Sequence, residues 1–297
     1  MFVSIDFGGS TIDVVFWRKD ANFEISEIRS FERENLFSGK SENFEKIFEV
    51  LDLSLEGVKK IFVTGGKSKF LPETFAHIPI VKISEIHAIG QGGYFLLHHD
   101  PILEKYRQEP KFLVVSMGTG TCMVTLKQPQ GILEKVVHAG GTGVGGGTFL
   151  GLAKALLHET DIRTLKKLFT TGDKNRVDLS VQEIIGSGIG KVPSEATAAH
   201  LAKLFHPAHQ REINFSRSDV AAGIVNLIGQ TIGLIAIFAA QASKASAILL
   251  TGKLTTIEKI IDIMVEIAHM YNIPMIVPNH AQYVSALGAW DSRLFLS

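Results

Sequence analysis

The sequence has little of what marks a secreted, membrane-bound or nucleic-acid-binding protein. It contains one cysteine, Cys122, so no disulfide can form within the chain, and this scarcity is typical of a reducing cytoplasm. Its 30 basic and 30 acidic residues cancel, which leaves no excess of positive charge for nucleic acid or an anionic bilayer. The chain opens directly on a strand-like run, so we expect no signal peptide. These absences predict a cytoplasmic globular protein without nucleic-acid or membrane partners.

Familiar metal and nucleotide motifs are missing as well. The 11 histidines show no HExxH or paired spacing, so we expect no zinc site. No GxxxxGK[ST] segment occurs, which disfavours a P-loop fold. Phosphate binding by this chain would therefore have to depend on another arrangement of glycines.

One long apolar run, residues 220–240, is long enough to span a bilayer. It contains Gly229-x-x-x-Gly233, which permits close helix packing, but it also carries Asn226 and Gln230. A single such run in an otherwise amphipathic chain indicates a buried core helix or a helix at a subunit interface. We interpret the protein as soluble.

Glycine, by contrast, is abundant and concentrates in turns. Six of the eight residues 140–147 are glycine, and apolar residues at helical spacing follow up to residue 157. Glycine lets a backbone approach a ligand closely because no Cβ intervenes. The first turn of a helix also presents unpaired N–H groups and a positive dipole end, which suit phosphate. The segment is therefore a candidate phosphate-binding loop.

Two further glycine turns, 8–11 and 118–121, each follow a buried strand-like run and precede two more strands. This repeat begins near Phe2 and again near Phe112, and it predicts two related α/β lobes, at 1–110 and 111–297, that face one another. Turns on opposite lobes could clamp a polyphosphate, and a strand-end carboxylate could hold Mg²⁺ through water. In the first turn the candidate residues are Asp6, for the metal, and Gly8, Gly9, Ser10 and Thr11, for phosphate.

Other segments complete the expected element order. Apolar spacing predicts helices at 43–51, 84–98, 148–158, 163–169, 194–205, 219–244, 255–270 and 281–294. Buried strands are expected at 61–64, 78–83, 247–250 and 274–277.

Taken together with the strand-end Gly252, the turns resemble those of phosphotransferases with the duplicated ribonuclease H-like fold of actin, hexokinase and Hsp70. More specifically, the sequence resembles the type II pantothenate kinases. The matching stretches are IDFGGST (5–11), FVTGGK (62–67), EIHAIGQGGYFLL (85–97), SMGTGT (116–121), GGTGVGGGTFLGL (140–152), GDKNRVDL (172–179), EATAAHLAKL (195–204) and ALGA (286–289). They follow the family's order over nearly the whole chain.

The resemblance implies roles for individual residues. Glu85 matches the family's catalytic base, although by itself it would only be a favourable acid at a helix N-terminus. Thr119 matches a threonine that binds nucleotide and lies near pantothenate. A second ATP-binding stretch matches Gly146, Gly147, Thr148, Phe149 and Leu150, and the adenosine end matches Gly252 and Lys253. The family is dimeric, and the long helix at 219–244 is a candidate for the interface.

Three positions depart from the family's pattern. A phosphate-facing lysine is replaced by Asp13, which makes this acid part of the expected ATP site. An arginine that clamps the carboxylate of pantothenate is replaced by His138, which is largely neutral at pH 7. A tyrosine that contacts the nucleotide is replaced by Ile162.

The resemblance implies an ATP- and Mg²⁺-dependent kinase that converts pantothenate to 4'-phosphopantothenate, the first step of coenzyme A synthesis. Two alternatives remain open. The acceptor could be another small alcohol or a sugar, or the chain could be a pseudokinase that binds nucleotide or acyl-CoA and regulates a partner. Asp13 favours the pseudokinase, whereas Asp6, Glu85 and Thr119 favour an enzyme. An activator-type ATPase of the same superfamily would need cluster cysteines, which the lone Cys122 disfavours.

Overall fold

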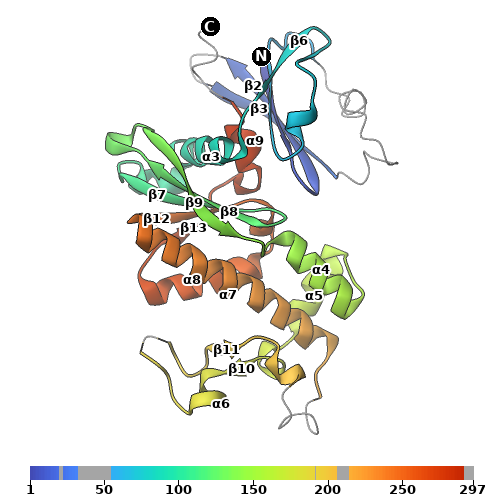
Figure 1. Cartoon of the computed structure of the whole chain (residues 1–297), viewed down its shortest axis with the longest axis vertical. Coiled ribbons are helices and arrows are strands. Elements are labelled where there is room, and N and C mark those ends of the chain that lie inside the picture. The colour runs from blue at the N-terminus through green and yellow to red at the C-terminus, as the bar shows by residue number, and fades with distance from the viewer. Residues whose placement is uncertain (20–22, 33–54, 191, 206–213, 291–297) are drawn as a thin grey trace.

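Two mixed β-sheets, one of six strands and one of five, form the centre of the protein (Figure 1). The computed structural model describes residues 1–19, 23–32, 55–190, 192–205 and 214–290. The first sheet has the order β3-β2-β1-β4-β6-β5, and the second has the order β13-β12-β7-β8-β9. The strands of the first sheet are β1 (Phe2–Phe7), β2 (Thr11–Lys19), β3 (Phe23–Glu32), β4 (Ile61–Thr64), β5 (Thr74–Phe75) and β6 (Ile78–Lys82). Those of the second are β7 (Lys111–Met117), β8 (Thr121–Lys127), β9 (Lys135–Thr142), β12 (Ala247–Thr251) and β13 (Met275–Ile276).

The two sheets are copies of one plan. In the first, β1 pairs antiparallel with β2 and parallel with β4, while β2 pairs antiparallel with β3. In the second, β7 pairs antiparallel with β8 and parallel with β12, while β8 pairs antiparallel with β9. The predicted strand–turn–strand–strand duplication is therefore confirmed. The proposed boundary near residue 110 stays a prediction.

Two helices join the sheets. Helix α3 (Glu85–His99) comes from the first half of the sequence but packs against β7, β8 and β9 of the second sheet. Helix α9 (Val284–Gly288), near the other end of the chain, packs against α3 and against β1, β2 and β4. The close approach of α3 and α9 needs glycine, because a Cβ at Gly92 or Gly288 would clash with the backbone of the facing helix.

A buried hydrogen-bond chain fixes α9 to the first sheet. The indole Nε1 of Trp17 donates to Ser4 Oγ at 2.7 Å, and that hydroxyl donates to the carbonyl oxygen of Ala286 at 2.6 Å. All four side chains of the surrounding aromatic cluster, Phe2, Trp17, Phe62 and Phe95, are buried. The core at this level thus contains residues from both ends of the sequence.

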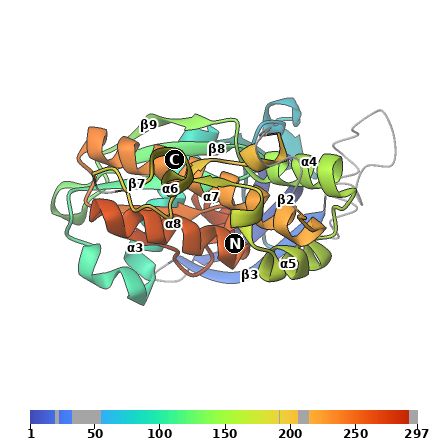
Figure 2. The ribbon, with the colours of Figure 1, turned by 90° about the horizontal axis from the view of Figure 1, so that it is seen from below.

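The other face of the second sheet carries α7 (Arg217–Ser243), the longest helix of the described chain, together with α8 (Glu258–Tyr271). The two helices lie side by side beneath the sheet, as two views at right angles show (Figures 1 and 2). By length and composition, α7 is the one helix in the described part of the chain that could cross a bilayer, but most of its apolar window is buried within the structure. This agrees with the core helix expected at 220–240.

Further elements follow the second glycine-rich segment. Helix α4 (Gly146–Leu157) and helix α5 (Ile162–Thr171) pack against α7. A small two-stranded sheet of β10 (Leu179–Ser180) and β11 (Thr197–Ala199), with the short helix α6 (Val181–Ile185), lies on the far side of α7 (Figure 1).

Two expected helices differ in the structure. The helix predicted at 194–205 is wrong: the segment contains β11, a turn at Leu201 with φ of 56°, and a short 3₁₀ helix (Ala202–Leu204). The helix predicted at 281–294 is, within the described residues, a 3₁₀ turn (Ala281–Tyr283) followed by the five-residue α9. The helix predicted at 43–51 lies outside the described residues.

Candidate active site

The glycine turns of the two sheets lie against one another. The first joins β1 to β2, and the second joins β7 to β8. A Cβ added to Gly9 would lie 2.5 Å from Oγ1 of Thr119, so any other residue here would force the threonine side chain to shift. Gly9, Ser10 and Thr119 are exposed, and Gly8 and Thr11 are partly exposed. Backbone and hydroxyl groups from both lobes therefore meet at one place on the surface.

Beneath the first turn lie two acids on neighbouring strands. Asp6 at the end of β1 is paired with Asp13 on β2 across the antiparallel ladder, so their side chains share one face of the sheet. Asp13 is 4% exposed and accepts hydrogen bonds from Ser30 Oγ at 2.6 Å and from Lys253 Nζ at 2.7 Å. Lys253 follows β12 in the second sheet, so this ion pair joins the two lobes.

The environment of Asp6 disfavours its charge. Burial raises the pKa of Asp6 to about 7, and the negative charges of Asp13 and Glu85 act in the same direction. The ammonium of Lys253 and the hydroxyl of Ser285 oppose this increase in pKa. A divalent cation beside Asp6 would relieve the repulsion among the acids, so the carboxylate fits the magnesium role expected from the sequence. Among the described residues, no cluster of three or more histidine, cysteine or acidic side chains could hold a metal unaided.

Glu85 lies near both turns. It is the first residue of α3, after the N-cap Ser84, whose Oγ accepts a hydrogen bond from the backbone N–H of His87 at 3.3 Å. Its charge helps to raise the pKa of Asp6 on β1, and also the pKa of the Cys122 thiol on β8, which burial raises most. The Glu85 side chain is exposed and makes no hydrogen bond with the other described residues. A carboxylate in this situation can accept a proton from a ligand.

The glycine-rich segment packs tightly onto the second turn. The N–H groups of Gly146 and Gly147, which begin α4, donate to the carbonyl oxygens of Gly118 and Thr119 at 2.8 and 2.9 Å. A Cβ at Gly145 would lie 2.6 Å from Cα of Gly120. Close packing of two backbone segments thus explains several of these glycines. The sequence predicted that the first N–H groups of this helix point at phosphate. In the structure, those of Gly146 and Gly147 donate to the second turn instead.

The rest of this stretch divides between surface and core. Thr148 Oγ1 donates to the carbonyl oxygen of Gly143 at 3.0 Å and accepts from the N–H of Gly145. Phe149 is 2% exposed and stands edge-on to Phe169 in the core, while Leu150 is half-buried. A ligand at this helix could therefore meet the backbone of Phe149, but the ring itself is a core residue.

Gly252 lies at the end of β12, beside the strand that leads into the second turn. Its φ is 87°, and a Cβ there would lie 2.6 Å from both the backbone N and the backbone O of Met117. Only glycine satisfies both conditions without strain. This glycine sets the path of the chain into Lys253.

His138, which the sequence predicts to contact pantothenate, is exposed on β9. It lies two residues after Val136, whose side chain packs against Gly90 of α3, so His138 points to the α3 side of the sheet. Within the described residues, His138 and Glu85 make no hydrogen bond or ion pair with each other. Ile162, the first residue of α5, is 37% exposed.

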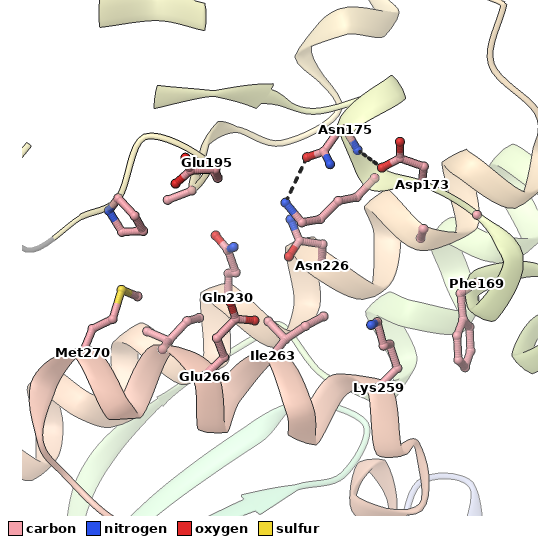
Figure 3. Close-up of a pocket in the computed structure, with 16 residues that line it drawn as sticks. Phe169, Asp173, Asn175, Glu195, Asn226, Gln230, Lys259, Ile263, Glu266 and Met270 are labelled. Atoms are coloured by element: carbon pink, nitrogen blue, oxygen red, sulfur yellow. Dashed lines mark hydrogen bonds between the residues drawn. The ribbon is translucent and has the colours of Figure 1, made fainter. Parts of the chain in front are cut away.

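A separate cavity lies on the far side of α7 from the second sheet. It has a volume of about 400 Å³ and is bounded by α7, α8, residues 172–175 and residues 193–196 (Figure 3). Its apolar lining includes Ile263 and Met270, and its polar lining includes Lys259 and Glu266. It shares no residue with the glycine turns, so the sequence-predicted phosphate residues do not line it.

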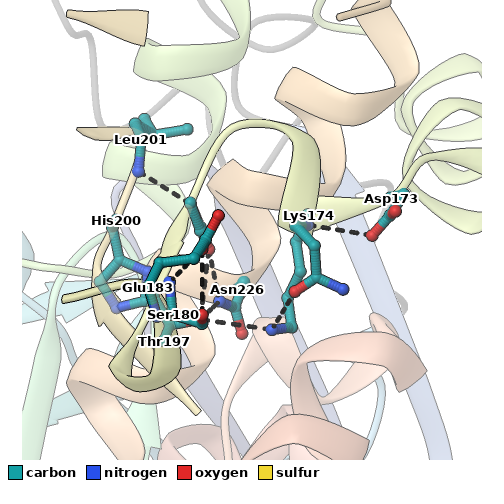
Figure 4. Close-up of polar contacts among 10 residues, drawn as sticks. Asp173, Lys174, Ser180, Glu183, Thr197, His200, Leu201 and Asn226 are labelled. Atoms are coloured by element: carbon teal, nitrogen blue, oxygen red, sulfur yellow. Dashed lines mark hydrogen bonds and ion pairs between the residues drawn. The ribbon is translucent and has the colours of Figure 1, made fainter. Parts of the chain in front are cut away.

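A buried polar network supports one wall of this cavity (Figure 4). Asn226, within the apolar helix α7, donates to Asp178 at 2.7 Å and to Thr197 Oγ1 at 2.9 Å. Asp178 is 2% exposed and also accepts from the N–H of Leu201, while Lys174 Nζ donates to Thr197 at 3.3 Å. The polar residue in an apolar run was visible in the sequence, but its partners were not.

The comparisons with known proteins agree with the duplicated fold. The sequence profile of the Fumble family matches residues 2–292. Type II pantothenate kinases of Bacillus cereus and Oceanobacillus iheyensis are each 27% identical, over 84% and 97% of this chain and 82% and 97% of their own lengths. The activator of the 2-hydroxyisocaproyl-CoA dehydratase from Clostridium difficile, solved with bound ADPNP, is 18% identical. It superimposes with a TM-score of 0.58, covering 97% of this chain and 92% of its own, which confirms the predicted fold class.

Proposed function

Because the chain belongs to the Fumble family, we propose that it is an ATP-dependent kinase of pantothenate, which produces 4'-phosphopantothenate for coenzyme A synthesis. The observation that carries the proposal is the meeting of the two glycine turns near an exposed Glu85 that makes no hydrogen bond within the described residues. This arrangement offers phosphate-binding groups from both lobes and a proton acceptor at one place.

In this proposal the turns hold the nucleotide. N–H groups and hydroxyls of Gly8, Gly9, Ser10 and Thr11 contact its phosphates from one lobe, and Thr119 contacts them from the other. The second stretch, Gly146 to Leu150, and the strand end at Gly252 bind the rest of the nucleotide, and Lys253, next in the chain, also contacts the nucleotide. Asp6 would hold Mg²⁺, which neutralises charge on the phosphates when it is bound.

Glu85 is proposed as the general base. Its carboxylate accepts the proton of the primary hydroxyl of pantothenate as the hydroxyl oxygen attacks the γ-phosphorus. A new P–O bond forms while the bond between the γ-phosphorus and the bridging oxygen breaks, and ADP leaves. Catalysis then depends mainly on positioning and on compensating phosphate charge. His138, on the α3 side of β9, is proposed to contact the acceptor.

We propose further that the enzyme is a cytoplasmic homodimer. Helix α7 has an exposed aromatic ring, Phe238 at 53%, on an otherwise largely buried helix, which makes its outer face a candidate for contact with a second copy. Light scattering of the purified protein tests this directly.

The decisive experiment is a phosphate-transfer screen of the purified protein with ATP and Mg²⁺ against pantothenate, pantetheine and common sugars. Formation of 4'-phosphopantothenate, identified by mass spectrometry, supports the proposal. Transfer to a sugar alone would show that the protein is a kinase but that pantothenate is not its phosphate acceptor. Nucleotide binding without transfer to any acceptor would favour the pseudokinase.

A further inference from the structure

Lys253 is held at the junction of the lobes by three different elements. Its Nζ donates to Asp13 on β2 at 2.7 Å and to Ser30 on β3 at 3.1 Å. The same ammonium lies 4.6 Å from the centre of the Tyr283 ring, close enough for a cation–π contact. The side chain is still 34% exposed.

This arrangement leaves the ammonium able to bind one more acceptor. An ammonium has three N–H donors, and within the described part of the chain the hydrogen bonds to Asp13 and Ser30 use two of them. A lysine side chain normally loses much conformational entropy when it binds a ligand. A lysine that is already fixed loses less, and so contributes more to affinity.

The acids beside the first turn favour such a cation. Asp6 and Asp13 are paired across β1 and β2, and the ammonium of Lys253 lies 2.7 Å from a carboxylate oxygen of Asp13. Acidic side chains beside a phosphate site repel a nucleotide unless nearby cations compensate for their charge. Lys253 reaches this place from the second lobe, 240 residues away in sequence from Asp13.

We propose that Asp13 is a positioning residue that holds the ammonium of Lys253 beside the first turn, where it binds the nucleotide's phosphates. The proposal rests on the proposed function, since it concerns the same nucleotide site. In this proposal Asp13 strengthens the binding of the anionic nucleotide, although Asp13 itself is negatively charged.

The effect of Asp13→Asn on nucleotide affinity has opposite signs in the two cases. If Asp13 only repelled phosphate, Asp13→Asn would tighten nucleotide binding, because a nearby negative charge would be removed. If Asp13 positions Lys253, the same substitution weakens binding, because the ammonium is no longer held. The sign of the change therefore separates the two cases.

The experiment measures binding of a fluorescent ATP analogue with Mg²⁺ to the full chain and to its variants. We expect Lys253→Met to weaken binding by roughly 10- to 100-fold, Lys253→Arg to retain most of it, and Asp13→Asn to weaken it by roughly 3- to 10-fold. In the Lys253→Met background, Asp13→Asn should instead leave binding unchanged or tighten it, because Asp13 then has no cation to hold. Kinetics should show these losses mainly in KM for ATP rather than in kcat.

Matched controls separate charge from location. Lys127→Met removes an exposed lysine at the opposite end of β8, and Glu24→Gln removes an exposed acid at the far end of β3; both should leave nucleotide binding unchanged. If Asp13→Asn does not fold, Ser30→Ala removes another anchor of the same ammonium and should weaken binding by roughly 2- to 5-fold.

Tighter binding by Asp13→Asn or by Ser30→Ala in the otherwise unchanged protein would overturn this inference and leave the kinase proposal intact. Equal effects of Asp13→Asn in both backgrounds would also overturn it. Failure of the unaltered protein to bind nucleotide would overturn both proposals. Nucleotide binding without transfer to pantothenate would overturn only the acceptor, because the binding assay does not involve it.

Discussion

The two glycine hairpins share a topology but differ in chemistry. Where β1 and β2 approach their turn, the cross-strand pair is Asp6 and Asp13, two acids. At the corresponding place in β7 and β8, the pair is Ser116 and Cys122, which carry no charge in their usual forms. The second turn instead gives its carbonyl oxygens to the start of α4.

The difference shows how a duplicated unit can divide its work. The first hairpin supplies ionisable groups, and its geometry depends on a salt bridge to Lys253. The second supplies backbone at close range, and its geometry depends on glycines that fit against other backbone. Substitutions that change charge should therefore affect the first hairpin most, and substitutions that add a methyl group should affect the second.

The largest expected effect concerns Glu85, the proposed general base. Glu85→Gln keeps the size of the side chain but removes the proton acceptor, so we expect kcat to fall by roughly 10²- to 10⁴-fold with nucleotide affinity nearly unchanged. Steady-state kinetics and analogue binding measure the two quantities. Glu134→Gln, an exposed acid before β9, is the control and should be silent. Near-normal turnover of the Glu85 variant would refute the base assignment.

One methyl group beside the second hairpin, at the end of β12, should destabilise the protein. Gly252→Ala combines an unfavourable φ of 87° with contact to the Met117 backbone, so we expect a loss of about 2–4 kcal/mol in the free energy of unfolding. Denaturant unfolding measures this loss. As the control, Gly151→Ala lies within α4 where nothing approaches within 4 Å, and it should stabilise the protein by about 0.5–1 kcal/mol. Equal effects at both positions would contradict the packing argument.

In the first hairpin, Asp6 should make the free energy of unfolding depend on pH. The pKa of Asp6 is raised from 3.8 to about 7, so the folded protein holds a proton there that the unfolded chain has lost. The free energy of unfolding contributed by this group therefore falls as the pH rises from about 4 to 7. Asp6→Asn should remove that fall and be more stable than the parent by about 3–4 kcal/mol at pH 8, with a smaller difference of about 1–2 kcal/mol at pH 5.

The comparison requires thermal or denaturant unfolding of both proteins at several pH values without Mg²⁺ or nucleotide. A constant difference across the range would mean that Asp6 titrates normally. The same variant should lose Mg²⁺-dependent transfer, so stability and activity change in opposite directions.

The smallest effect is expected for Thr119, a side chain of the second glycine turn. Thr119→Val removes a hydroxyl while nearly keeping the shape, and backbone groups of the same turn remain, so nucleotide affinity should fall by only about 3- to 10-fold. Thr160→Val, exposed after α4, is the matched control. A loss of several hundred-fold would show that the second turn binds through its side chain rather than its backbone.

Much of the fold followed from local patterns in the sequence. Apolar spacing and glycine turns predicted β1, β7 and α7 to within a few residues, because each is set by its own periodicity. The segment 195–204, EATAAHLAKL, was misjudged because its alanine-rich spacing favours a helix. In the structure, pairing of β11 with β10 and the bond from the Leu201 N–H to buried Asp178 outweigh that preference.

The candidate site was predictable only where the sequence itself carries the signal. The glycine turns and Asp6 could be found from strand ends, and Glu85 from a family resemblance. The partner of Asp13 could not, because Lys253 is far away in sequence and comes close only when both lobes are assembled. Likewise, no local pattern shows that Gly146 and Gly147 donate to the second turn.

The bond from Ser4 to Ala286 has a consequence for how the protein is made. The first strand emerges from the ribosome well before the helix that covers it, because Ser4 and Ala286 are 282 residues apart. At about 5–20 residues per second, apolar surface of β1 would wait many seconds for its partner. Nascent chains should therefore depend on chaperones until α9 emerges, and a fragment that ends before residue 281 should aggregate even though every strand of both sheets is present.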